Sequence, residues 1–137
     1  MLGTEKEHHP LDPSSAAAGR LARERTGLEE FAHRVHDKLE LVPGERAIYV
    51  FIGKPPDAFG IAWIEHGEEH NFKRLMKEKG LSEGEFRTRS EELRAAYVRS
   101  KEEPRYTADV GGKHVLVTPS PTLERELVDV IHRVVEE

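Results

Sequence analysis

The feature that most constrains the fold is a run at residues 46–52 that is apolar on both faces. Its β-branched and aromatic residues favour a strand, and a strand without a polar face belongs in the middle of a sheet. Residues 53–57, Gly-Lys-Pro-Pro-Asp, must leave that strand as a loop, because consecutive prolines cannot join a hydrogen-bonded ladder. We therefore expect a fold built around a sheet whose central strand is residues 46–52.

The clearest hairpin in the chain covers residues 105–118 and turns at Gly111 and Gly112. Both glycines can adopt the positive φ that a two-residue turn requires. In that register Asp109 faces His114 on the polar side of the hairpin. A carboxylate that orients an imidazole can serve acid–base catalysis, but no Ser or Thr is placed as a nucleophile. We therefore favour a cross-strand ion pair.

Residues 59–65 are expected to return as the second strand of a hairpin, because Phe, Ile and Trp favour a pleated surface. The alternative is a helix that starts at Asp57, since the apolar spacing also fits a helical stripe. Elsewhere, apolar residues recur at intervals of three and four, which predicts helices. These helices cover residues 26–42, 72–80, 82–100 and 121 onward.

The predicted fold class is α+β, with the order α-β-β-α-α-β-β-α. Two hairpins form an antiparallel sheet, and the helices pack on it. Residues 1–25 show no sustained apolar face, so we expect a flexible N-terminal arm. Residues 26–137 are then a single α+β domain.

Composition narrows the classes of protein. The 137 residues include no cysteine, which excludes disulfide frameworks, zinc ribbons and thiol nucleophiles. The longest apolar run, residues 47–52, is far shorter than the about 20 residues of a membrane-spanning helix. The formal net charge of -5 argues against sequence-independent binding to nucleic acid. The first residues lack the pattern of a secretory signal, so we expect a cytoplasmic protein without a membrane partner.

A candidate metal site consists of His66, Glu69 and His70, whose letters match the inverted zinc-peptidase motif. In that motif a helix places two histidines and a glutamate on one face. A divalent metal ion would then be the cofactor of a metal-binding protein or a metal-dependent hydrolase. Gly67 disfavours a helix, so we favour a polar turn. The metal alternative gains weight only if residues 59–65 are helical.

Residues 75–86 resemble the first two helices of a helix-turn-helix DNA-binding domain, with Gly80 at the corner. The second helix then continues without the turn that would introduce a recognition helix. Its Arg87, Arg89 and Arg94 alternate with glutamates, as on a solvated surface. Nucleic-acid binding through this helical pair is an alternative that we do not favour.

A rigid loop beside Tyr49, Phe59 and Trp63 makes these residues candidates for the rim of an apolar pocket. The last helix is apolar over more of its circumference than a one-sided contact needs, which suggests a homodimer interface or burial between the sheet and a neighbour. Our leading hypothesis is a non-enzymatic binding or regulatory module for a protein partner or a small ligand. The residues leave open whether the chain is an enzyme.

Overall fold

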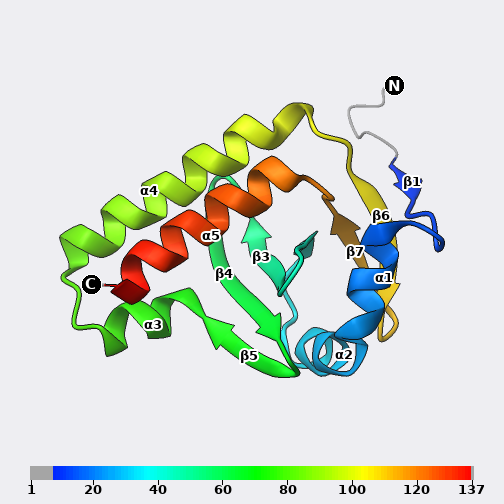
Figure 1. Cartoon of the computed structure of the whole chain (residues 1–137), viewed down its shortest axis with the longest axis horizontal. Coiled ribbons are helices and arrows are strands. Elements are labelled where there is room, and N and C mark those ends of the chain that lie inside the picture. Colours follow the sequence, from blue (N-terminus) through cyan, green and yellow to red (C-terminus); the bar gives the residue numbers. More distant parts are fainter. Residues whose placement is uncertain (1–7, 137) are drawn as a thin grey trace.

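A computed structural model describes residues 8–136, which form a seven-stranded sheet with helices on both faces (Figure 1). Within this range, no helix combines the length and the apolar character needed to cross a membrane. The elements in chain order are β1 (His9–Pro10), α1 (Ala16–Arg23), α2 (Arg25–Arg34), β2 (Leu39–Pro43), β3 (Ile48–Lys54), β4 (Ala58–Glu65), β5 (Glu68–Asn71), α3 (Phe72–Glu78), α4 (Glu83–Arg99), the 3-10 turn η1 (Ser100–Glu102), β6 (Tyr106–Val110), β7 (Lys113–Val117) and α5 (Pro121–Glu136).

The sheet is mixed, with the strand order β1-β6-β7-β2-β3-β4-β5. The β3–β4 and β6–β7 hairpins are antiparallel as predicted, and β4 also pairs antiparallel with β5. β2 joins the two hairpins, because it runs antiparallel to β3 and parallel to β7. β1 pairs parallel with β6 at one edge. The predicted antiparallel sheet of two hairpins and its element order are therefore wrong, although the α+β class is confirmed.

The error arises at β2, which lies inside the segment predicted as one helix, residues 26–42. α2 ends at Arg34, and Val35 already has extended backbone angles of φ -101° and ψ 119°. Every residue of β2 is buried, with Leu39 facing one core and Glu40 facing the other side of the sheet. Pairing with a strand on each side outweighs the helical spacing that includes Leu39, because tertiary context overrides local propensity.

The sequence predicts a flexible arm over residues 1–25, of which residues 1–7 lie outside the described residues. From residue 8 onward the segment is part of the fold, since it forms β1 and α1. At its end, the Glu24 carboxylate accepts hydrogen bonds from the backbone N–H groups of His66 and Gly67, each at 3.0 Å. The junction between α1 and α2 is thereby attached to the β4–β5 turn.

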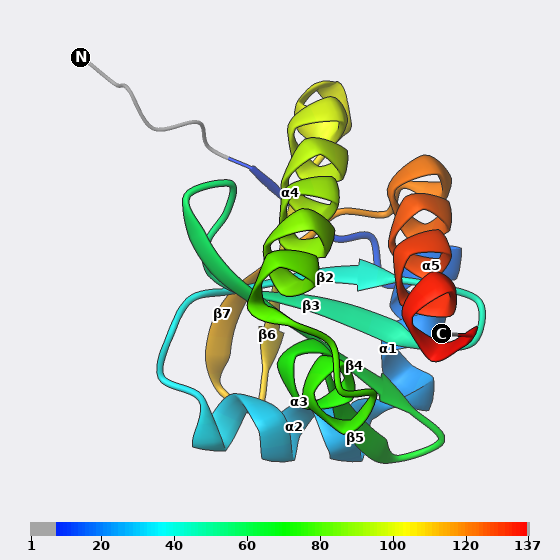
Figure 2. The same ribbon diagram turned by 90° about the vertical axis from the view of Figure 1, so that its left-hand side faces the viewer.

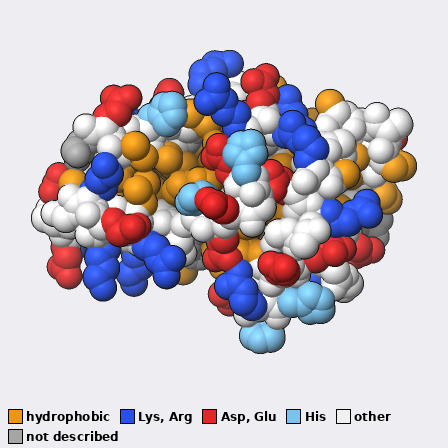
Figure 3. Space-filling model, turned by 60° about the horizontal axis from the view of Figure 1, so that its bottom comes forward, with side chains coloured by type: hydrophobic (Ala, Val, Ile, Leu, Met, Phe, Trp, Pro, Cys, Tyr) orange, Lys and Arg blue, Asp and Glu red, His pale blue; other side chains and the backbone are white. Residues whose placement is uncertain are grey.

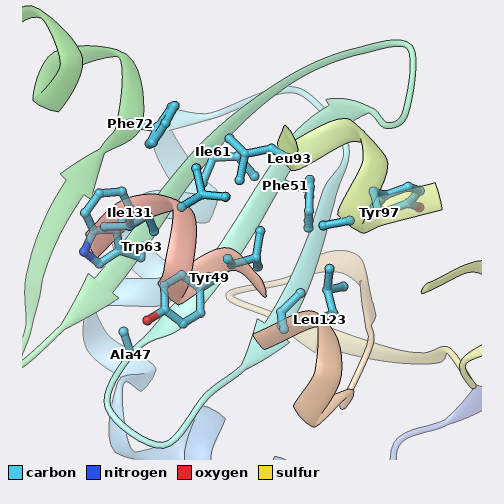
Figure 4. Packing of buried hydrophobic residues seen from close by; sticks show 14 of the residues in the cluster. Ala47, Tyr49, Phe51, Ile61, Trp63, Phe72, Leu93, Tyr97, Leu123 and Ile131 are labelled. Carbon is cyan, nitrogen blue, oxygen red and sulfur yellow. The ribbon is translucent and has the colours of Figure 1, made fainter. Parts of the chain in front are cut away.

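The sheet separates two hydrophobic cores, as the alternation along β3 shows. Tyr49 and Phe51 contribute to one core, whereas Ile48 and Val50 contribute to the other. α3, α4 and α5 cover the first core, and α1 and α2 cover the second (Figure 2). Phe51 lies against Tyr97 of α4 with ring centroids 5.0 Å apart, in the centre of the first core (Figure 4).

Several local predictions are confirmed. Residues 59–65 lie in β4, so the strand and not the helix forms there. α4 begins with a capping box, in which the Ser82 side chain accepts from the Glu85 backbone and the Glu85 side chain accepts from the Ser82 backbone. The final hairpin has the predicted register, with Asp109 opposite His114. Where capping or turn chemistry is strong, local sequence is sufficient.

The second core leads to a prediction about Phe31 of α2, which is 2% exposed. Replacing it (Phe31→Ala) should lower the free energy of unfolding by about 3–5 kcal/mol, because a large buried ring is removed and a cavity remains. Urea denaturation measures the change. The exposed Val135 of α5 provides the control: Val135→Ala should stay within about 0.5 kcal/mol of the wild type. A small effect of Phe31→Ala would contradict the packing of α2 on the sheet.

Candidate functional site

The three residues of the metal hypothesis do not meet at one point. His66 lies in the β4–β5 turn at φ 53°, with 87% of its side chain exposed. Glu69 and His70 are successive residues of a strand, so their side chains point to opposite faces. The His70 ring stacks on Trp63 at 5.5 Å between centroids, whereas Glu69 forms an ion pair with Arg34 of α2. Among residues 8–136, no three His, Asp or Glu side chains are grouped to hold a metal ion.

The polar pair of the last hairpin forms as a surface contact. His114 Nδ1 and Asp109 Oδ1 are 3.0 Å apart, and each side chain is 72% exposed. Exposed ion pairs of this kind are common on protein surfaces and contribute little to stability. The pair is therefore largely exposed to solvent, and Asp109 also borders a hollow lined by α1, α2 and β6.

The three aromatic residues of the predicted pocket divide between two environments. Tyr49 and Trp63 are buried in the first core, with ring centroids 6.5 Å apart, and burial raises the pKa of Tyr49 to about 12. Phe59 is only partly buried and lies near the tip of the β3–β4 hairpin, against Phe51 at 5.6 Å. The Arg94 guanidinium stands over the Phe59 ring at 5.5 Å. Phe59 borders a hollow of the surface.

That hollow, which we call the α3–α4 groove, has a volume of about 930 Å³ and lies between α3, α4 and the tip of the β3–β4 hairpin. β4, α3, α4 and the loop between the two helices supply its apolar floor. The four floor side chains belong to the first core or pack against it. The floor consists of Phe59, Met76, Leu81 and Phe86. The charged residues of its rim are Lys73, Lys77, Arg87, Arg94, Asp57, Glu83 and Glu91.

Local backbone chemistry positions the groove. Gly80 has φ 71°, and the Leu81 N–H donates to the Met76 carbonyl at 3.1 Å, so α3 ends in a tight turn that brings Leu81 to the floor. On the opposite side, Arg94 donates to the carbonyl oxygens of Pro56 and Asp57, the latter at 2.9 Å. These bonds hold the hairpin tip against α4, so the two walls of the groove are fixed relative to each other.

A second hollow, which we call the basic hollow, has a volume of about 560 Å³ and lies on the other side of α3. Lysine and arginine side chains gather at this end of the molecule (Figure 3). Within the described range, Lys73, Arg74 and Lys77 have no acidic side chain within 4.0 Å. Lys73 and Lys77 also border the α3–α4 groove, so the two hollows share one wall. The lining residues of the basic hollow are Arg34, Glu69, Asn71, Lys73, Arg74 and Lys77.

A buried polar network anchors the other end of α4. Glu40 is 4% exposed, and its carboxylate accepts hydrogen bonds from the Tyr97 hydroxyl at 2.7 Å and from Arg105 Nε at 2.9 Å. The Thr118 hydroxyl donates to the same carboxylate. Arg105 in turn donates to the backbone and side-chain oxygens of Ser100. In the described part of the chain, every buried side-chain nitrogen and oxygen has a hydrogen-bond partner. A fully paired buried network of this kind stabilises the packing of the elements that it joins.

Sequence reasoning missed the groove, the basic hollow and the network. The sequence indicates a hydrophobic contact between Leu81 and Phe86 around the α4 capping box. The basic residues of α3 are spaced so that they lie on one surface of the helix: Lys73, Arg74 and Lys77. Neither signal reveals that the β3–β4 hairpin tip closes the groove. Nothing in the sequence indicated that Glu40 would be the centre of a buried network, because its strand was predicted as a helix.

Searches against protein-family models, curated proteins and solved structures found no match to this chain.

The buried network predicts a large effect of Glu40→Ala. The substitution leaves the Arg105 charge buried without its carboxylate, so the free energy of unfolding should fall by about 3–5 kcal/mol. The double variant Glu40→Leu/Arg105→Met should recover much of this loss, since no uncompensated charge remains. Urea denaturation tests both variants, with Asp109→Ala as the exposed control. Equal losses in the single and double variants would show that the charge pair is not the cause.

The two buried tyrosines predict an alkaline transition. Burial, followed by the nearby Glu40 charge, raises the pKa of Tyr97 to about 12, and burial likewise raises that of Tyr49. Because both folded pKa values lie above the ordinary tyrosine value of 10.0, their contribution to stability is complete below pH 10.0 and is lost as the pH rises through about 12.

A phenolate absorbance titration, with circular dichroism to monitor the fold, measures these pKa values. Two of the three tyrosines should ionise near pH 12, and Tyr97→Phe should remove one of them. Ionisation of all three near pH 10 in the folded protein would contradict the burial of these rings.

Proposed function

We propose that the chain is a non-catalytic binding module that takes an acidic, amphipathic segment of a partner protein into the α3–α4 groove. The observation that carries the proposal is an apolar floor beside cationic side chains in a chain of net charge -5. An apolar groove with a polar rim is the usual form of a peptide-docking surface.

The length of the groove fits a short peptide. α4 lines it from Glu83 to Arg94, which corresponds to about 16 Å at 1.5 Å per residue. That length accommodates about three turns of a docked helix, with apolar side chains three and four residues apart directed at the floor. The floor side chains Phe59 and Phe86 are partly buried, so a docked side chain would complete their packing.

The charges of the rim favour an acidic segment. Arg94 is occupied by its backbone bonds and by its ion pair with Glu91, so these two rim charges offset each other. Lys73, Lys77 and Arg87 have no acidic partner within the described residues. Carboxylates on the bound segment would pair with them and would also raise the association rate by electrostatic steering.

The other functions considered from the sequence receive less support. Of the three arginines on the helical pair considered for nucleic-acid binding, Arg94 holds the hairpin tip and Arg89 pairs with Glu92, which leaves Arg87. The wide apolar face of α5, which suggested a homodimer, is used within the chain: Leu123, Leu127, Val130, Ile131 and Val134 are all buried. We keep the expected cytoplasmic location as part of the proposal.

Selection from a displayed peptide library tests the groove. Wild-type protein should enrich sequences that combine acidic residues with apolar residues at helical spacing. Phe86→Ala should weaken the binding of selected peptides about tenfold or more, because it removes an aromatic side chain from the floor.

Val98→Ala is the matched control, since Val98 is an apolar residue of the same helix that is 45% exposed and does not line the groove. It should bind the selected peptides as the wild type does. Equal weakening by both substitutions, or selected peptides that bind Phe86→Ala as well as wild type, would rule out the groove as the binding surface.

A further inference from the structure

The basic hollow carries an excess of positive charge over the acidic side chains that line it. Its lining holds four cationic side chains, Arg34, Lys73, Arg74 and Lys77, and one carboxylate, Glu69, a formal excess of three positive charges. The carboxylate is engaged by Arg34. A compact ligand group with more than one negative charge matches this excess better than a single carboxylate does.

The polar groups of the hollow are arranged to donate hydrogen bonds. Arg34 is oriented by its ion pair with Glu69 and by the Phe31 ring, whose centroid lies 5.8 Å from its guanidinium carbon. The Asn71 side-chain oxygen accepts from the Arg74 N–H at 3.1 Å, which fixes the amide. Its NH₂ group has no partner within residues 8–136 and is available to a ligand. Guanidinium, ammonium and amide donors together are the set that recognises phosphoryl oxygens.

We infer that the basic hollow binds a phosphoryl group carried by the segment docked in the α3–α4 groove. The inference rests on the proposed function, because Lys73 and Lys77 form the wall common to both hollows. A phosphorylated side chain carries about -1.5 to -2 charges at neutral pH and several acceptor oxygens. The partner is thus an acidic segment whose affinity rises when a residue at one end of its apolar stretch is phosphorylated.

The first test uses inorganic phosphate as the probe and amide NMR shifts of the full chain as the readout. Phosphate should produce saturable shifts confined to the neighbourhood of Arg34 and residues 69–77. The double variant Arg34→Gln/Arg74→Gln should weaken this binding about tenfold or more, since it removes two charge-assisted donors. Both residues line the basic hollow and not the groove, so peptide packing on the floor is left intact.

Lys101→Gln/Arg125→Gln provides a control with the same change of charge away from the basic hollow, and it should bind phosphate as the wild type does. Phe86→Ala should also leave phosphate binding unchanged. Shifts that do not saturate, or that are weakened equally by the control, would overturn the inference while leaving the proposed groove untouched.

A second test compares a library-selected peptide with its phosphoserine form. Phosphorylation should strengthen binding about tenfold, and the gain should vanish in Arg34→Gln/Arg74→Gln. No gain in the wild type would overturn the inference even if free phosphate binds. Tighter binding of a single-stranded oligonucleotide than of the phosphopeptide would also overturn it, in favour of a nucleic-acid surface.

Discussion

One buried carboxylate, Glu40, determines how the layers of this protein meet. It receives hydrogen bonds from Tyr97 on α4, from Arg105 ahead of β6 and from Thr118 after β7. A buried charge is tolerated only when its partners are in place, so these elements must converge on β2. The convergence holds the C-terminal end of α4 over the sheet. One turn before Tyr97, Arg94 of the same helix binds backbone carbonyls of the hairpin tip and closes the α3–α4 groove.

Local chemistry in the sequence was sufficient for much of the fold. The paired glycines of the last hairpin, the capping box at Ser82 and the β-branched run of residues 46–52 predicted elements that the structure confirms. The prediction failed at β2. Leu39 continues the helical spacing of the residues before it, and the segment becomes a strand because it pairs with β3 and β7. The candidate site, too, could be predicted only where local sequence was sufficient. Phe59 was selected, but the groove it borders depends on contacts between residues far apart in sequence, which periodicity does not contain.

The proposed site combines two kinds of recognition around one helix. On one side of α3, Met76 and Leu81 contribute to an apolar floor, and on the other side Arg74 contributes to a cationic hollow. Lys73 and Lys77 form the wall between them. A partner that uses only the apolar floor gains area but little selectivity, whereas a charged group placed beside it sets orientation and register. The rigid walls also lower the cost of binding, because the groove need not be ordered by the partner.

The most direct test of this account is an amide NMR titration of the full chain with a library-selected acidic peptide. The account predicts that shift changes and intermolecular contacts lie in the hairpin tip at residues 57–59, in α3 and in the first turns of α4, with β1, β6 and β7 unaffected. Changes centred on the exposed end of α5 or on the β1 edge would contradict it. In that case the α3–α4 groove would be a feature of packing alone, and binding would belong to another face of the sheet.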